Sequence, residues 1–158
     1  MFAPSSALTL CSWNTRALFS SYSTSSPLAS QRYKQMYGLV GRFDAVCLQE
    51  THGTESDAEM LQRDDRCRNS IVHSSMIDPS AGGGVVTVLS SKLASQFDSI
   101  TPYPLIAGRI LASHLKGRRG DLVIVNVHMP NTSDPVAMYR RYLSVIQAFL
   151  PLAAHTRA

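Results

Sequence analysis

The apolar positions of this chain fall into short runs that end abruptly at polar residues or glycines, which is typical of buried β-strands. The clearest run covers residues 45–48 and stops at Gln49 and Glu50. Further strands are predicted in the same way at residues 8–14, 69–76, 85–89, 109–115 and 121–128. Residues 116–120 read K-G-R-R-G, so the last two strands are predicted to form a hairpin with a basic turn.

A first helix is predicted between the first two strands. Apolar residues follow helical spacing from Pro27 onward, and Gly38 or Gly41 can end the helix. A strand, a helix and a second strand in succession form a crossover unit, which makes the two strands parallel neighbours. We therefore expect Asn14 and Glu50 to emerge at the same edge of one sheet.

Two more helices have recognisable starts. Thr54 is a hydroxyl residue with a carboxylate three residues later, a capping box that opens a short helix towards residue 67. Ser133 or Asp134 caps the last helix, Pro135 takes its first position, and an apolar stripe follows. We expect Pro151 to end this helix, because proline lacks a backbone donor.

The remaining segments are read as loops. The Ser- and Thr-rich residues 20–26 are predicted to be a loop, and residues 82–84 are three consecutive glycines before a strand. These glycines could admit a backbone or a phosphate closely, or form a flexible turn with a bulge, and both interpretations stay open. Together the elements predict an α/β fold in which two packed sheets are flanked by helices.

Size and composition indicate one domain over residues 1–158. With 44% hydrophobic residues, the chain can build one core. Its three cysteines lack C-x-x-C spacing and are expected to be free, mostly buried thiols in a reducing compartment. The absence of a signal sequence and of a long apolar segment predicts a soluble, intracellular protein, with a nuclear location left open.

Charge is distributed unevenly. The net charge is +4, and residues 80–158 hold 8 Lys and Arg against 3 Asp and Glu. Residues 1–79 hold 7 against 8, a net of −1. A basic half suits a polyanion such as nucleic acid, although ordinary surfaces are also often basic.

Glu50 is the first charge after the clearest strand, at a sheet edge where ligands gather. A single carboxylate in that place could hold Mg²⁺, which often takes one or two carboxylates and completes its shell with phosphate and water. The alternative is an ordinary solvated glutamate at a strand end.

Five short motifs follow one another in order: W-N at residues 13–14, Q-E-T at 49–51, G-G-V at 83–85, G-R-I at 108–110 and N-V-H-M-P-N at 126–131. This order resembles the endonuclease/exonuclease/phosphatase superfamily, and most of all the endonuclease domains of non-LTR retrotransposons. The resemblance implies a four-layer α/β sandwich, in which two packed mixed sheets are flanked by helices. It also implies hydrolysis of phosphodiesters or phosphoesters that depends on Mg²⁺, for which Mn²⁺ can substitute.

The resemblance assigns roles to individual residues. Glu50 matches the metal-binding glutamate, Asn14 an asparagine near the scissile phosphate, and His128 a catalytic histidine or tyrosine. A carboxylate, an amide and an imidazole suit these tasks, because they can bind a cation, donate to phosphate and transfer a proton. The competing interpretations are a turn-forming asparagine for Asn14 and an ordinary strand-end histidine for His128.

A second group is assigned to substrate or phosphate binding. Arg109 matches a frequent family arginine, with a structural role or a surface ion pair as alternatives, and Asn131 closes the last motif. Arg118 and Arg119 lie in the basic hairpin turn, away from the expected metal edge, where they could contact nucleic acid.

The resemblance stops at residue 131. No G-D-x-N strand, further carboxylate or D-H pair follows His128, and His155 lacks the context to belong to such a pair. The resemblance therefore implies a domain incomplete at its C-terminus, because domains of this kind run to roughly 200–250 residues.

Three functions are consistent with the sequence. The leading one is a Mg²⁺-dependent endonuclease domain acting on DNA, with no obligate protein partner and no membrane. The others are a phosphatase or phosphodiesterase for a small phosphorylated molecule, and a catalytically dead remnant that binds polyanions.

Overall fold

The computed structural model describes residues 7–19, 27–77 and 82–155. The predicted loop at residues 20–26 lies outside these ranges. The described residues form these elements in chain order: β1 (Leu10–Asn14), α1 (Pro27–Val40), β2 (Ala45–Gln49), α2 (Glu55–Arg63), β3 (Ile71–Ser75), β4 (Val85–Leu89), α3 (Ser91–Ala94), β5 (Ser99–Ile106), β6 (Ile110–Lys116), β7 (Leu122–Val127) and α4 (Pro135–His155).

The strands form two sheets, one of four strands in the order β1-β2-β4-β3 and one of three in the order β5-β6-β7. Strands β1 and β2 are parallel, with Asn14 opposite Gln49, whereas every other neighbouring pair is antiparallel. The crossover prediction is therefore confirmed, and Asn14 and Glu50 emerge at the same edge. The predicted hairpin is also confirmed as β6 and β7.

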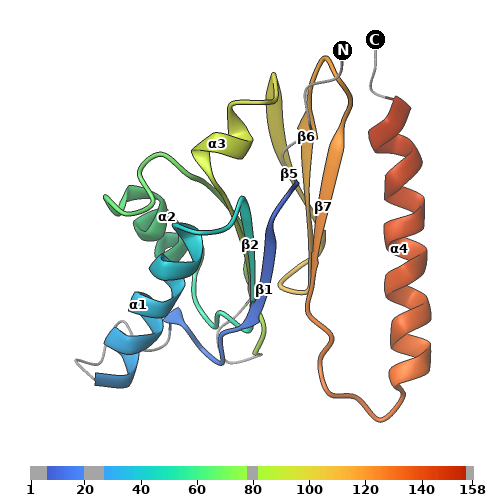
Figure 1. Ribbon diagram of the computed structural model, residues 1–158. Helices are drawn as coiled ribbons and strands as arrows, with labels where there is room; N and C mark the ends of the chain where they lie inside the picture. The colour runs from blue at the N-terminus through green and yellow to red at the C-terminus, as the bar shows by residue number, and fades with distance from the viewer. Residues whose placement is uncertain (1–6, 20–26, 78–81, 156–158) are drawn as a thin grey trace.

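Apolar side chains fill three successive layers. One cluster, which includes Met36 and Leu61, lies between helices α1 and α2 and the four-stranded sheet. A second, which includes Leu89 and Leu115, lies between the sheets, and a third joins Phe149 of α4 to the three-stranded sheet. Helices therefore cover both outer faces (Figure 1). The expected α/β sandwich is confirmed, with a mixed larger sheet and a wholly antiparallel smaller one.

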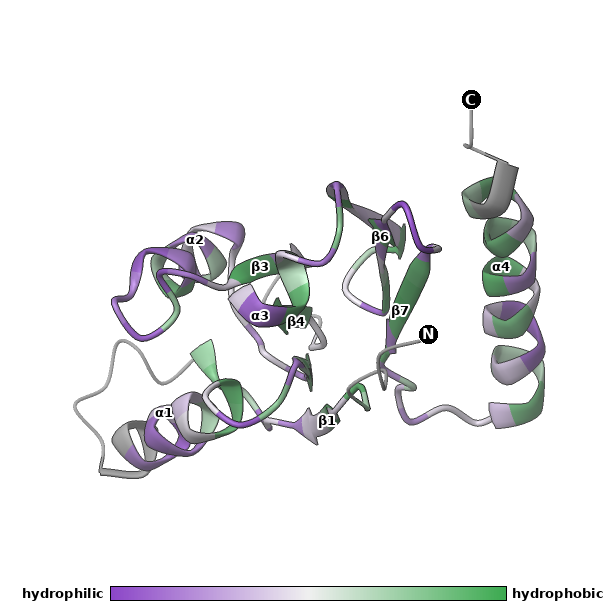
Figure 2. Ribbon diagram, turned by 45° about the horizontal axis from the view of Figure 1, so that its top comes forward, coloured by the Kyte–Doolittle hydropathy of each residue, from purple (hydrophilic) through white to green (hydrophobic). Residues whose placement is uncertain are grey.

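Hydropathy follows these layers. Strands β4 and β7 are hydrophobic, and helices α1 and α2 turn hydrophilic residues outward (Figure 2). Polar links nevertheless cross between the sheets. Gln49 Nε2 donates to Asn126 Oδ1 at 2.7 Å, and His73 Nδ1 lies 2.8 Å from Ser113 Oγ. Because these groups are buried, the links fix how the sheets are registered on each other.

Most predicted helix boundaries agree with the structure. Helix α1 begins at Pro27 and continues through Gly38 to Val40. Thr54 caps α2, and its backbone N–H donates to Asp57 Oδ2 at 2.7 Å. Within the described ranges, no helix has the length and apolar character needed to cross a membrane.

Helix α4 corrects one prediction, because it continues through Pro151 to His155. Proline leaves the carbonyl of Gln147, four residues earlier, without its usual helical partner. Gln147 lies on the exposed side of the helix, where water can bind that carbonyl. Ala153, in contrast, is buried against the sheet, so packing holds the last turn in place.

Strand β5 and the short helix α3 were not predicted. Strand β5 contains Pro102 and Pro104, which argue against a central strand. It pairs only with β6, so it is an edge strand where missing donors are tolerated. Tyr103 and Leu105, between and after the prolines, pack against α4.

Candidate functional site

Five chain segments meet at one end of the sandwich, where β1, β2 and β7 end and where β4 and β6 begin. A continuous series of backbone hydrogen bonds joins them. Ala17 donates to the carbonyl of Glu50 at 2.7 Å, and His52 donates to that of Gly83 at 2.9 Å. Gly84 then donates to Gly108 at 3.0 Å, which links the first sheet to the second.

The backbone at this end adopts an unusual conformation. Among the described residues, four that are not glycine have positive φ angles, and all lie here: Arg16 at 47°, Ala17 at 69°, Glu50 at 51° and His52 at 49°. The left-handed region costs a residue with a Cβ atom about 1–2 kcal/mol. Such strain persists only where surrounding contacts enforce it, and it is concentrated at functional sites.

The glycine run packs against protein atoms. At Gly83, where φ is 114°, a Cβ atom would lie 3.0 Å from Arg109 Nη1. At Gly84, where φ is 83°, it would lie 2.5 Å from Thr51 Oγ1. These two glycines are required because the chain approaches Arg109 and Thr51 too closely for a side chain. Close approach, the first of the two interpretations, therefore applies, and what approaches is the protein itself.

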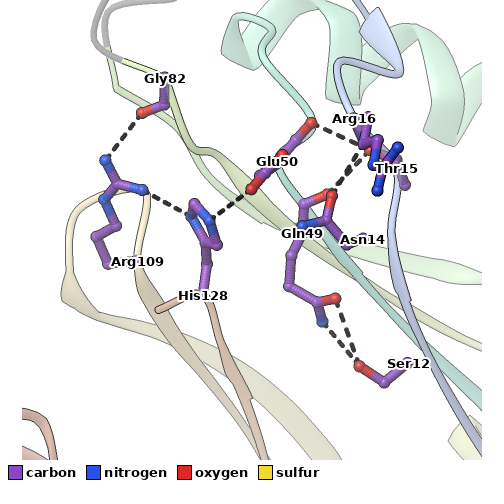
Figure 3. A network of polar contacts seen from close by, with 9 residues as sticks. All are labelled: Ser12, Asn14, Thr15, Arg16, Gln49, Glu50, Gly82, Arg109 and His128. Atoms are coloured by element: carbon purple, nitrogen blue, oxygen red, sulfur yellow. Dashed lines mark hydrogen bonds and ion pairs between the residues drawn. The ribbon is translucent and has the colours of Figure 1, made fainter. Parts of the chain in front are cut away.

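The side chains of Arg109, His128 and Glu50 form one hydrogen-bonded row (Figure 3). Arg109 Nη1 lies 2.7 Å from His128 Nδ1, and its Nη2 donates to the Gly82 carbonyl at 3.2 Å. His128 Nε2 lies 3.1 Å from Glu50 Oε1. A guanidinium can only donate, so Nδ1 of His128 accepts and its Nε2–H donates to the carboxylate. Arg109 thereby fixes the tautomer of His128.

The electrostatics of the row are consistent with a neutral histidine beside a charged carboxylate. The hydrogen bond from Asn14 lowers the pKa of Glu50 most, and the one from His128 lowers it further, against the opposing effect of burial. Burial has the largest effect on the pKa of His128 and lowers it. The charge of Arg109 lowers this pKa further, whereas Glu50 opposes the shift. At neutral pH the site therefore presents a carboxylate, a neutral imidazole and a guanidinium.

Asn14 connects this row to the loop after β1. Its Oδ1 accepts a hydrogen bond from the backbone N–H of Arg16 at 3.1 Å. Since that oxygen is engaged, the amide nitrogen of Asn14 is the group that can donate towards Glu50 or an incoming oxyanion. His52 is a neighbour that the motifs did not single out, although its charge affects the pKa of both Glu50 and His128. The sequence signal that could have identified His52 was its position directly after the Q-E-T motif.

The donor set fits a hard divalent cation held by one protein carboxylate. Glu50 is 31% exposed at its side chain, so an incoming ion can reach it. The described residues contain no group of three or more His, Cys, Asp or Glu that could hold a metal. A site with one carboxylate resembles the way Mg²⁺ is bound in part by water and substrate phosphate.

The structure separates the predicted site residues into two groups. Asn14, Glu50, Arg109 and His128 come together from four segments, as described above. Asn131 lies exposed in the loop after β7. Arg118 and Arg119 lie in the β6–β7 turn, at the opposite end of the three-stranded sheet, about 20 Å from Arg109 for a strand of this length.

No family model and no curated protein matches this chain. Among solved structures, it is similar to the crystal structure of an AP endonuclease from Leishmania major, with a TM-score of 0.59 and 19% sequence identity. The match covers 95% of this chain and 47% of that chain, so this chain spans about half the length of that enzyme. At this level of identity the similarity concerns the fold, and this chain therefore shares a nuclease-like fold with an AP endonuclease.

Proposed function

We propose that this chain provides the metal-binding and phosphate-orienting side of a nuclease that hydrolyses phosphodiester bonds in nucleic acid, with DNA as the favoured substrate. The observation that carries the proposal is the convergence of Asn14, Glu50, Arg109 and His128. These residues, up to 114 positions apart in sequence, combine a strained backbone, a hydrogen-bonded row and an accessible carboxylate, and this combination is typical of a functional site.

Each side chain has a definite task in this proposal. Glu50 would hold Mg²⁺, which neutralises charge on the scissile phosphate when bound. Asn14 donates its amide to a phosphate oxygen, and Arg109 adds a positive charge on the other side of the carboxylate. The Nε2–H of His128 is held in place to donate to an oxygen on the phosphate, because Arg109 occupies Nδ1.

The decisive variant is Glu50→Gln, which preserves size and hydrogen bonding but removes the anion that a hard cation prefers. Mn²⁺ can be used as a paramagnetic probe, with its binding followed by electron paramagnetic resonance. We expect the parent chain to bind one Mn²⁺ that Mg²⁺ displaces, and Glu50→Gln to bind it at least tenfold more weakly. Equal binding by the two proteins would contradict the metal assignment.

Activity is measured separately, in a domain completed with the second half of a protein of the same fold, as nicking of supercoiled plasmid across a Mg²⁺ titration. We expect metal-dependent nicking that Glu50→Gln abolishes, while p-nitrophenyl phosphate is a poor substrate. Hydrolysis of the small ester without nicking would favour the phosphatase alternative instead. Metal-independent nicking at the parent rate by Glu50→Gln would refute the proposed function.

A further inference from the structure

A hollow of about 440 Å³ adjoins the candidate site on the side of Asn14. It lies between the loop after β1 and the exposed side of α1, and it shares Asn14 with the site. Its other principal residues are Trp13, Arg16, Gln31, Arg32 and Gln35. We call this hollow the Asn14 groove. Nothing in the row formed by Arg109, His128 and Glu50 requires these residues.

The chemistry of the Asn14 groove differs from that of the other polar hollows. Its lining contains two guanidinium groups, three amides and an indole, and no carboxylate. The hollow that contains Arg118 and Arg119 also contains Asp98 and Asp121. A hollow of about 570 Å³ beside Asp44 likewise mixes basic residues with Asp44 and Asp65. A groove whose charged groups are all cations attracts an anionic ligand.

The sequence reinforces this contrast. Residues 1–43 contain four Lys and Arg and no Asp or Glu, and Asp44 is the first acidic residue of the chain. Two of these four basic residues, Arg16 and Arg32, line the groove. The net charge of −1 over residues 1–79 does not reveal the basic character of residues 1–43, because the acidic residues that begin at Asp44 outweigh it.

The backbone holds Arg16 in place at the groove. Its φ of 47° and the 69° of Ala17 are unfavourable for side-chain-bearing residues. Three contacts maintain this turn: Arg32 Nη1 donates to the Arg16 carbonyl at 2.6 Å, Asn14 Oδ1 accepts from the Arg16 N–H at 3.1 Å, and Ala17 donates to Glu50. The strained turn therefore places a guanidinium beside the residue that contacts Glu50.

We propose that the Asn14 groove binds the sugar-phosphate backbone of the nucleic-acid strand that flanks the phosphate at Glu50. Arg16 and Arg32 contact successive phosphates, because arginine matches the geometry of phosphate oxygens. Gln31 and Gln35 donate amide hydrogens, and the partly exposed indole of Trp13 supplies a flat face for sugar or base. This inference rests on the proposed function for the position of the scissile phosphate.

The test compares charge-matched variants. Arg16→Gln and the double variant with Arg32→Gln remove cations from the groove, whereas Arg119→Gln and the double variant with Arg118→Gln remove the same charge from the hairpin turn. Binding to a fluorescein-labelled 20-base-pair duplex is measured by anisotropy in EDTA, from 50 to 200 mM NaCl. Thermal melts of all four variants identify any loss of folding, and Arg16→Gln, which removes only an exposed side chain, remains informative if the double variant melts early.

We expect the groove double variant to bind about tenfold more weakly at 100 mM salt, and its log–log salt slope to fall by about 1.8, since each phosphate contact contributes about 0.9. The turn variants should lose clearly less affinity, because Asp98 and Asp121 in the same hollow offset the charge of Arg118 and Arg119. That result would also count against the sequence-based assignment of these two arginines to nucleic-acid binding. Equal or greater loss in the turn variants would overturn the proposal, as would the absence of saturable binding by the parent.

Trp13 gives an internal reporter, because it is the one tryptophan of the chain. Saturating duplex should quench its emission in the parent and in the turn variants. Unchanged emission at saturation would place the nucleic acid elsewhere and overturn the proposal. Poly-glutamate tests a different class of ligand. If, at matched charge, it quenches Trp13 emission as much as the duplex does and displaces the labelled duplex equally well, the groove binds an acidic polypeptide instead.

These measurements separate the groove from the proposed function. If the Arg16 effect and the Trp13 quench are observed but no metal-dependent nicking occurs, the hydrolase proposal fails and the groove stands. If nicking depends on Glu50 while Arg16→Gln binds duplex like the parent, the groove fails and the hydrolase proposal stands.

Discussion

Two histidines of the β6–β7 hairpin, one near each end of the smaller sheet, pair with a carboxylate. His128 Nε2 is 3.1 Å from Glu50 Oε1, and His114 Nε2 is 3.2 Å from Asp121 Oδ2. By distance alone the two pairs are equivalent. Their surroundings differ in a way that separates a candidate catalytic group from a structural one.

The difference lies in the second ring nitrogen. That of His128 binds Arg109, which comes from the start of β6, and the pair opens towards Asn14. That of His114 is buried and has no hydrogen-bond partner among the described residues, and Tyr103 packs beside the ring. A histidine–carboxylate pair therefore indicates a catalytic site only when a third group sets the tautomer of the histidine and a ligand can reach the pair.

Altering the histidine–carboxylate pair at each end should give the largest contrast in activity. In the completed domain, we expect His128→Ala to lower single-turnover nicking by about 10²–10⁴-fold, because a positioned proton donor and a charge-stabilising hydrogen bond are lost together. Asp121→Asn, which alters the other pair, should leave the rate within about twofold. A parent-like rate in His128→Ala would show that the two pairs are equally inert.

The glycines at the two ends provide a contrast in stability. Gly83→Ala should lower the free energy of unfolding by about 2–4 kcal/mol, because a Cβ meets both Arg109 Nη1 and the carbonyl of Gly108 at 3.0–3.1 Å and φ is positive. Gly120→Ala should cost only about 1 kcal/mol, since φ is 137° but nothing lies within 4 Å. Urea titrations measure the free energy of unfolding of both variants. Equal losses of stability would mean that the contact with Arg109 does not constrain position 83.

Acid should weaken the contact between the sheets. Burial lowers the pKa of His73 below 6.5, so the unfolded state binds more protons as the pH falls. Stability is therefore retained above about pH 6.5 and is lost below it, at no more than about 1.4 kcal/mol per pH unit for this group. His73→Asn should reduce the slope of the free energy of unfolding against pH, and His128 should account for the slope that remains. An unchanged slope in urea titrations at pH 5.0–7.0 would contradict this.

The smallest effect is expected at the basic turn. Arg118 Nε lies 3.9 Å from Asp98 Oδ1, and the two side chains are 91% and 63% exposed. We expect Arg118→Ala to change the free energy of unfolding by less than about 0.5 kcal/mol, because water screens an exposed pair. A loss above about 1 kcal/mol would show that the turn end is ordered as tightly as the Glu50 end.

Local patterns were enough to predict most of the elements. The apolar run before Glu50, the hydroxyl at Thr54 and the proline at position 135 each specify their own neighbourhood, because strand burial and helix capping depend on nearby residues. The parallel pairing that brings Asn14 beside Glu50 also followed, since a crossover helix leaves few other arrangements. The order of the motifs then indicated the architecture.

Proline was overinterpreted at residue 151, and tertiary packing also explains how Pro102 is accommodated in a strand that was not predicted. Pro102 lies in an edge strand, and Pro151 in a helix, because each missing hydrogen bond can be tolerated on an exposed side. Whether a backbone donor is needed depends on what lies beside the chain. A single sequence does not contain that information.

The sequence by itself determined which residue types stand at the strand ends, and hence which chemistry is available there. It did not distinguish among the arginines. Arg109 orients His128, Arg16 lines a groove without carboxylates, and Arg118 lies beside Asp98. Only the tertiary structure decided these roles, because the electrostatic effect of a cation depends on the charges within a few ångströms of it, and those come from distant parts of the chain.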